Sequence, residues 1–131
     1  MSLTEEQRAT RAAFLEQVEP QIIPVLHAGR MIEVRQPTLG ERGWIYEHAT
    51  ELVDGKVKFN FSALQVRAVI ACACYPGTTR RVFAEPEAPE LLRQLAGGAI
   101  DRLAVAALKL LNVDGAGIDR LVGRLLRRGK K

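Results

Sequence analysis

The chain has 131 residues, a formal net charge of +4 and only 5% aromatic residues. This length suits one compact domain that buries roughly two-thirds of its unfolded surface without disulfides or a structural metal. The low aromatic content predicts an aliphatic, alanine-rich core and favours packed helices over a sandwich or barrel. No apolar run approaches the ~20 residues that span a bilayer, so a membrane is not expected as a partner.

The positive charge is concentrated at one end of the chain. Residues 119–131 hold six Lys and Arg residues against one acidic residue, whereas residues 1–118 hold 13 basic and 14 acidic residues. The basic character therefore belongs to the tail and does not indicate a basic binding face on the domain. The polar, acidic start Met1–Glu6 is not expected to be a secretory signal. Cys72 and Cys74 are expected to be reduced thiols that fill the core.

The first thirty residues predict one helix and a connector. Thr4 is a suitable N-cap for a helix that runs to about Val18, before Pro20 and Pro24 break it. Two prolines and a glycine then predict that residues 20–30 form a connector.

A strand and a second helix are expected next. Residues 31–35 alternate apolar and charged side chains, which predicts a short half-buried strand. Thr38 and Glu41 have the spacing of a capping box, and the apolar residues after it recur at helical spacing as far as Leu52. Asp54 and Gly55 are expected to stop this helix.

The middle of the chain contains the first part of the predicted core, which we expect around residues 64–74 and 100–111. Residues 56–61 alternate again and are expected to be a short strand or a linker with two apolar anchors. Ser62 and Gln65 form a second possible capping box. Residues 66–74 carry one charge, Arg67, so they predict the most buried helix.

The last third of the chain predicts two or three more helices. One begins near Pro89 and is expected to turn Leu91, Leu92 and Leu95 inward. Residues 100–111 carry the most regular helical stripe of the sequence. In sum, the sequence predicts a mainly α protein, a compact bundle of five or six helices with one or two very short strands. It divides into an N-terminal helix and connector (1–30), a helical core domain (31–113) and a basic amphipathic tail (114–131).

Residue types alone point to no catalytic site, no metal site and no cofactor. His48 lies on the inner side of the second predicted helix, has no second ligand at a metal-binding spacing and is expected to be packed and hydrogen-bonded. Glu47 and Glu51 would share one helix face, where two solvated carboxylates are expected. No nucleophile elbow and no phosphate-binding glycine motif is present.

The tail is the strongest local feature. Its aliphatic stripe spans just over two turns, too short for a stable isolated helix, so it must dock on its own core, on another subunit or on a partner. A membrane surface or a nucleic acid fits less well, because the tail lacks aromatic anchors. The candidate partner-binding residues are the five stripe residues with two arginines at the rim, namely Ile118, Leu121, Val122, Leu125, Leu126, Arg124 and Arg128.

Two stretches together resemble a known family. The first runs from Ile32 to Arg42 and contains Thr38-Leu39-Gly40-Glu41-Arg42. The second begins with the Ala/Val/Cys helix of residues 66–74, continues through Arg81-Val82-Phe83 and ends with the helix that closes at Leu111-Asn112. This order resembles the tail assembly chaperones of long-tailed, siphovirus-type bacteriophages or prophages, over about residues 31–113.

The resemblance implies a non-enzymatic role. Such proteins bind the tape measure protein, help recruit tail tube subunits and leave before the virion is complete, so host cytoplasm is the expected location. We also expect homo-oligomers, because several copies along one long client gain avidity from contacts between neighbours. A structural component such as a head–tail connector subunit is the alternative, and a small nucleic-acid-binding regulator ranks below it.

Overall fold

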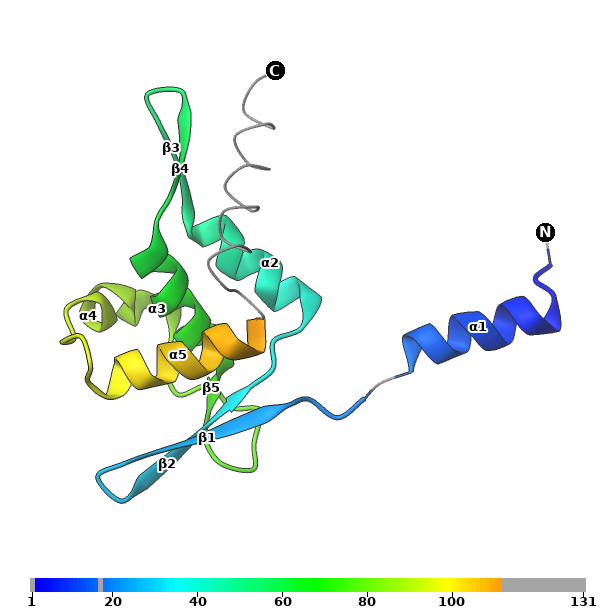
Figure 1. Cartoon of the computed structure of the whole chain (residues 1–131), viewed down its shortest axis with the longest axis horizontal. Coiled ribbons are helices and arrows are strands. Elements are labelled where there is room, and N and C mark those ends of the chain that lie inside the picture. The colour runs from blue at the N-terminus through cyan, green and yellow to red at the C-terminus, as the bar shows by residue number, and fades with distance from the viewer. Residues whose placement is uncertain (1, 17, 112–131) are drawn as a thin grey trace.

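The computed structural model describes residues 2–16 and 18–111 (Figure 1). The prediction of a mainly α bundle is wrong for this part of the chain. Five α-helices are combined with five strands in two antiparallel sheets, one with the order β1-β2-β5 and one formed by β3 and β4. The fold is therefore an α/β fold. The cause of the error lies in two hairpins. Strand β1 forms where a connector was expected and β3 where the end of a helix was expected, whereas β4 fits the strand alternative that was given for residues 56–61.

The helices are α1 (Glu5–Leu15), α2 (Leu39–His48), α3 (Phe61–Cys72), α4 (Ala88–Leu92) and α5 (Ala99–Leu111), with a 3₁₀ turn, η1 (Glu85–Glu87), before α4. The strands are β1 (Ile22–His27), β2 (Arg30–Arg35), β3 (Thr50–Val53), β4 (Lys56–Phe59) and β5 (Ala73–Cys74). Within residues 2–16 and 18–111, no helix has both the length and the apolar character to cross a membrane.

The core lies where α3 and α5 pack against each other and against the three-stranded sheet. Leu64, Ala68 and Val69 of α3 are fully buried, as is Ala107 of α5. The prediction of a core around residues 64–74 and 100–111 is confirmed, and so is the central position of the nearly apolar helix α3. Helix α3 carries almost no charged side chains because α2, α4 and α5 pack around it.

The segment expected to be a connector forms a hairpin instead. Residues 22–27 pair with residues 30–35 in antiparallel register around a two-residue turn, Ala28-Gly29, where both residues have positive φ. This backbone matches the tight hairpin turns that suit the right-handed twist of strands. Pro24 is tolerated because β1 lies at the edge of the sheet, where one side of the strand needs no hydrogen-bond donors.

A second hairpin replaces the end of the second predicted helix. Helix α2 ends at His48, ten residues after its N-cap, and β3 pairs with β4 around Asp54 and Gly55, whose φ angles are 52° and 75°. The Asp-Gly pair is therefore a hairpin turn and not a helix stop. As a consequence Glu51 lies on β3, so the prediction that Glu47 and Glu51 share a helix face is wrong.

The predicted helix caps are confirmed in two of three cases. The Thr4 and Thr38 side chains accept hydrogen bonds from the backbone N–H of Gln7 and Glu41, each at 3.1 Å, and both capping boxes are closed. At α3, however, the cap is Asn60, whose side-chain oxygen accepts from the Ala63 N–H at 3.0 Å. The helix begins one residue before Ser62, so the expected capping box at Ser62 does not form.

The capping carboxylate of α2 also holds a distant loop. Arg81 Nη2 donates to Glu41 Oε2 at 2.6 Å. Partial burial acts to raise the pKa of Glu41, but hydrogen bonds from Thr38 and Arg81 outweigh it, so the pKa lies below its ordinary value of 4.5.

A lowered carboxyl pKa predicts a contribution to stability that acid removes. The contribution of Glu41 is fully present above pH 4.5 and is lost as the pH falls through the lower pKa of the folded state. We expect Glu41→Gln to reduce the free energy of unfolding at pH 7 and to flatten its decline below pH 4.5. Urea unfolding from pH 7 to pH 3 measures both effects, and Glu47→Gln is the matched control on the same helix. Equal acid sensitivity of the native and Glu41→Gln chains would contradict this prediction.

Candidate functional site

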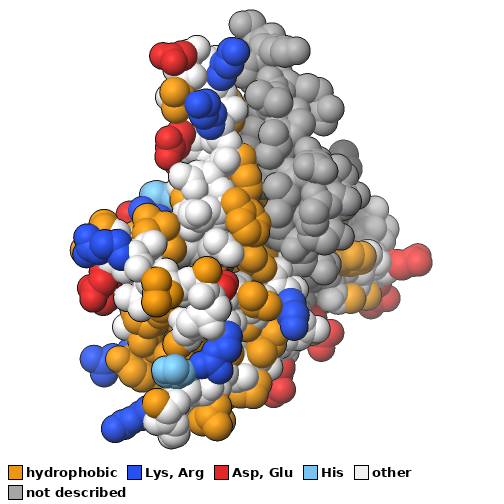
Figure 2. Space-filling view, turned by 60° about the vertical axis from the view of Figure 1, so that its left-hand side comes forward, with side chains coloured by type: hydrophobic (Ala, Val, Ile, Leu, Met, Phe, Trp, Pro, Cys, Tyr) orange, Lys and Arg blue, Asp and Glu red, His pale blue; other side chains and the backbone are white. Residues whose placement is uncertain are grey.

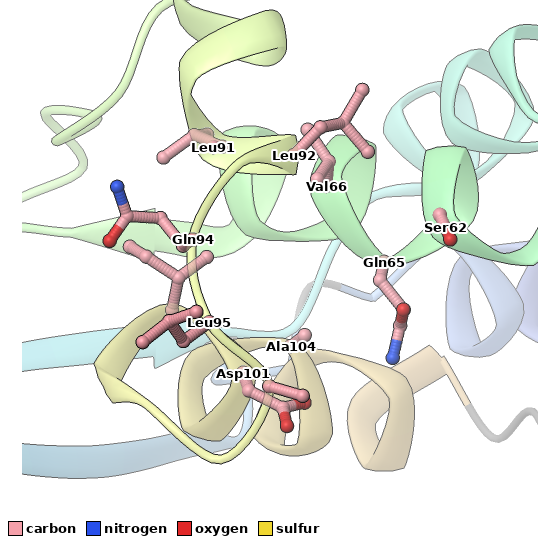
Figure 3. Close-up of a pocket in the computed structure, with 11 residues that line it drawn as sticks. Ser62, Gln65, Val66, Leu91, Leu92, Gln94, Leu95, Asp101 and Ala104 are labelled. Atoms are coloured by element: carbon pink, nitrogen blue, oxygen red, sulfur yellow. The ribbon is translucent and has the colours of Figure 1, made fainter.

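A groove opens between α3, α4 and the first turns of α5 (Figure 3). It encloses about 240 Å³, below the roughly 300–1,000 Å³ of small-molecule sites. Its floor is apolar, with Val66 and Leu91 buried and Ile100 and Ala104 contributed by α5. The size and lining suit a few aliphatic side chains of a partner.

The rim of the groove is also apolar on one side. Leu92 at the end of α4 is half exposed, and Leu95 in the loop after it is 83% exposed. The prediction that these two residues face inward is wrong, because α4 ends at Leu92 and only Leu91 turns toward the core. Helical spacing suggested that all three leucines would be buried, but the helix is too short to continue that pattern.

The polar groups that line the groove are spread along it and do not converge on one point (Figure 3). Ser62, Gln65 and Gln94 line it together with Asp101, which is the one residue with an acidic or basic side chain among the described lining residues. The Asp101 carboxylate accepts a hydrogen bond from the Gly97 N–H at 2.7 Å. That bond fixes the turn between α4 and α5, so the role of Asp101 is to maintain the shape of the groove.

A second cluster of polar side chains joins α2, α3 and η1. The ring centroids of Trp44 and His48 lie 4.8 Å apart, and His48 Nδ1 lies 2.9 Å from the Trp44 carbonyl oxygen, which confirms the packed, hydrogen-bonded histidine that was predicted. The Arg67 guanidinium lies 5.4 Å from the Trp44 ring centroid, and its Nη1 lies 3.4 Å from Glu85 Oε1. This stacking and charge pairing hold three elements together.

The tip of the first hairpin is tied to α5 by one arginine. Arg102 Nη1 donates to the Leu26 carbonyl oxygen at 3.1 Å, and Arg102 Nη2 lies 2.6 Å from His27 Nδ1. Because a guanidinium only donates, Nδ1 of His27 is the acceptor. Arg102 thereby satisfies a backbone carbonyl of β1, which is an edge strand of the sheet.

The two cysteines are buried thiols whose environment keeps them protonated. Cys72 and Cys74 are free and buried, as expected for core residues. Burial is the main cause that raises the pKa of the Cys72 thiol to about 12, and burial also raises the pKa of Cys74. A thiol that stays protonated at neutral pH is a poor nucleophile.

The candidate contact residues of the tail, from Ile118 to Arg128, lie outside the described residues. Among residues 2–16 and 18–111, no group of three or more His, Cys, Asp or Glu side chains is placed to hold a metal ion.

Comparisons with known proteins give one structural similarity. No protein-family model matches the chain, and no curated protein sequence matches it. The solved structure of the bacteriophage HK97 tail assembly chaperone is similar to this structure, with a TM-score of 0.48 and 19% sequence identity. The match covers 81% of this chain and 99% of the HK97 chain.

Proposed function

We propose that this chain is a non-enzymatic tail assembly chaperone of a long-tailed bacteriophage or prophage. It binds the tape measure protein, helps recruit tail tube subunits, self-associates, acts in the host cytoplasm and is absent from the mature virion. The observation that carries this proposal is the order of motifs over residues 31–113, from the Thr38 capping box through the buried α3 to the helix that ends at Leu111.

The groove supplies a surface that suits this role. An amphipathic client helix can place apolar side chains on the floor formed by Val66, Leu91 and Ala104, while Leu92 and Leu95 cover it from the rim. A helix in water exposes apolar side chains at positions three and four residues apart. Covering such a stripe keeps a long client soluble, because exposed apolar patches promote association. Binding of this kind needs no catalytic group.

The tail is proposed as a second client contact. Its stripe from Ile118 to Leu126 presents aliphatic side chains at helical spacing, with Arg124 and Arg128 at the rim. The groove and the tail are separate in the sequence, so each can be tested alone.

Client binding tests the proposal directly. We expect Leu92→Asp combined with Leu95→Asp to weaken binding of purified tape measure fragments by about tenfold or more, since full burial of one leucine contributes about 1.5–3 kcal/mol. Leu121→Ser with Leu125→Ser should also weaken binding and leave the melting temperature nearly unchanged. Calorimetry measures both, and Leu52→Asp on the exposed face of the β3–β4 hairpin is the control. Unchanged affinity in both double variants would refute this surface assignment.

The alternatives give different results in the particle. Mass spectrometry of purified virions should find tail proteins without this chain. If the chain is retained at a fixed copy number, it is a structural component such as a head–tail connector subunit. Steeply salt-dependent DNA binding that disappears when residues 119–131 are removed would instead indicate a nucleic-acid-binding regulator.

A further inference from the structure

Helix α1 is folded but packs on nothing within the described part of its own chain. It has a closed capping box at Thr4, yet none of its residues is buried, and Figure 1 shows it standing apart from the rest of the molecule. Phe14 is 88% exposed, and Leu15 and Val18 beside it are exposed as well. An isolated helix of 11 residues is marginal in water. The N-terminal arm, defined as residues 2–19, therefore needs a surface on which to dock.

A matching surface exists on the three-stranded sheet. Ile23, Val25 and Ile32 of the first hairpin face α5 and the core, so the alternate residues face outward. These outward residues are apolar and exposed, with Leu26 59% exposed, and they form the outer strip, defined as Ile22, Pro24, Leu26 and Met31. Figure 2 shows hydrophobic side chains exposed among basic ones over the lower part of the molecule.

The charges of the two surfaces are complementary. The arm carries Glu5, Glu6, Glu16 and Glu19 against two arginines, a balance of −2. The outward-facing residues of the hairpin include Arg35 and Glu33, and the adjacent loop of residues 75–81 adds Arg80 and Arg81, a balance of +2, although Arg81 is already paired with Glu41. This loop borders the outer face, because the Gly77 N–H donates to the Glu33 carboxylate at 2.6 Å. An acidic arm with an apolar end is thus complementary to a basic sheet face with an apolar strip.

The connection between α1 and β1 directs the arm away from its own strip. Gln21 still belongs to the sheet ladder, since its carbonyl oxygen accepts from the Gln36 N–H at 2.8 Å. Pro20 biases Glu19 toward extended backbone, and Glu16 is extended as well, with φ −59° and ψ 128°. Figure 1 shows α1 beyond the Ile22 end of β1 and apart from the sheet.

We infer that the arm docks on the outer strip of a second copy of this chain, with Phe14 and Leu15 against Leu26 and Met31. The inference rests on the self-association included in the proposed function, but it concerns a surface separate from the client groove. Because arm and strip are different surfaces, each copy offers one of each, and the contact can join neighbours head to tail or in reciprocal pairs.

Complementation between two variants tests this inference. The arm variant is Phe14→Asp with Leu15→Asp, and the strip variant is Leu26→Asp with Met31→Asp. All four side chains are exposed, so both variants should fold, which circular dichroism verifies. By light scattering, the native chain should form dimers or larger species at high concentration, and each variant alone should be monomeric. Leu52→Asp is the matched control and should behave as the native chain.

An equimolar mixture gives the decisive result. The intact arm of the strip variant can bind the intact strip of the arm variant, so the mixture should form a heterodimer with one interface. A monomeric native chain, a variant that still self-associates, or a mixture that stays monomeric would each overturn the inference. Client affinity of the arm variant, measured in parallel, separates the two proposals. If the arm variant loses self-association but still binds the client, the result supports the arm contact. Loss of client binding by the groove variant alone tests the proposed function and not the arm contact.

Discussion

Replacing Leu64 with alanine is expected to lower the free energy of unfolding by about 3 kcal/mol. Leu64 is 0% exposed and belongs to the cluster that joins α3, α5 and the sheet. The substitution removes apolar surface from the core and leaves a cavity whose walls belong to regular elements, so little collapse can fill it. Small domains are stable by only about 5–15 kcal/mol, so this single change should shift the urea midpoint strongly.

Leu95→Ala is the matched control for this experiment. The chemical change is the same, but the Leu95 side chain is already in contact with water, and surface substitutions of this kind stay within about 0.5 kcal/mol. Equilibrium urea unfolding followed by circular dichroism measures both. If Leu64→Ala and Leu95→Ala cost the same, α3 is not the centre of the core. The pair also separates stability from client binding, because only Leu95 lines the rim of the groove.

The helices could be predicted because each carries a signal within its own residues. Residues 100–111 carry an apolar stripe because a regular helix places residues of fixed spacing on one buried face. Helix α3 is apolar nearly all round because most of its faces are buried. Thr38 and Glu41 close a cap whose atoms lie within four residues of one another. Such signals can be recognised without knowledge of tertiary contacts. The helices that carry them were therefore predicted to within a few residues of their observed bounds.

The hairpins were missed because their signals depend on partners elsewhere. Pro24 argues against a strand unless the strand is known to lie at an edge, and edge position is set by the pairing of β1 with β2 alone. The Asp54-Gly55 pair is equally typical of the end of a helix and of a tight hairpin turn. Strand β5 has two residues, and its pairing with Glu33 and Val34 joins segments about forty residues apart.

The candidate groove could be predicted only in part. Leu91, Leu92 and Leu95 were recognised beside a helix start, but all three were expected to face inward. Which of the leucines is buried depends on where α4 ends and on how Asp101 holds the turn through Gly97. The groove itself exists because three segments, from α3, α4 and α5, meet in space, and no spacing within one segment encodes that meeting.

Enlarging a small, fully buried side chain of α5 should be nearly as damaging as emptying the core. Ala107 of α5 is fully buried in the same cluster as Ala68 and Ala71 of α3. Small side chains let two helices approach closely, and closely packed interiors have no room for added methylenes. We expect Ala107→Leu to lower the free energy of unfolding by about 2–3 kcal/mol, although leucine and alanine are both good helix formers.

Val105→Leu is the control for added side-chain volume at an exposed position of α5. Val105 lies two residues away on the same helix, where its side chain is half exposed, so a larger group there meets water. The control should unfold at nearly the native urea concentration, whereas Ala107→Leu should unfold earlier. If both variants match the native chain, α3 and α5 do not pack through their alanines. In that case the α/β core, and with it the groove that α3 and α5 share with α4, would need a different arrangement.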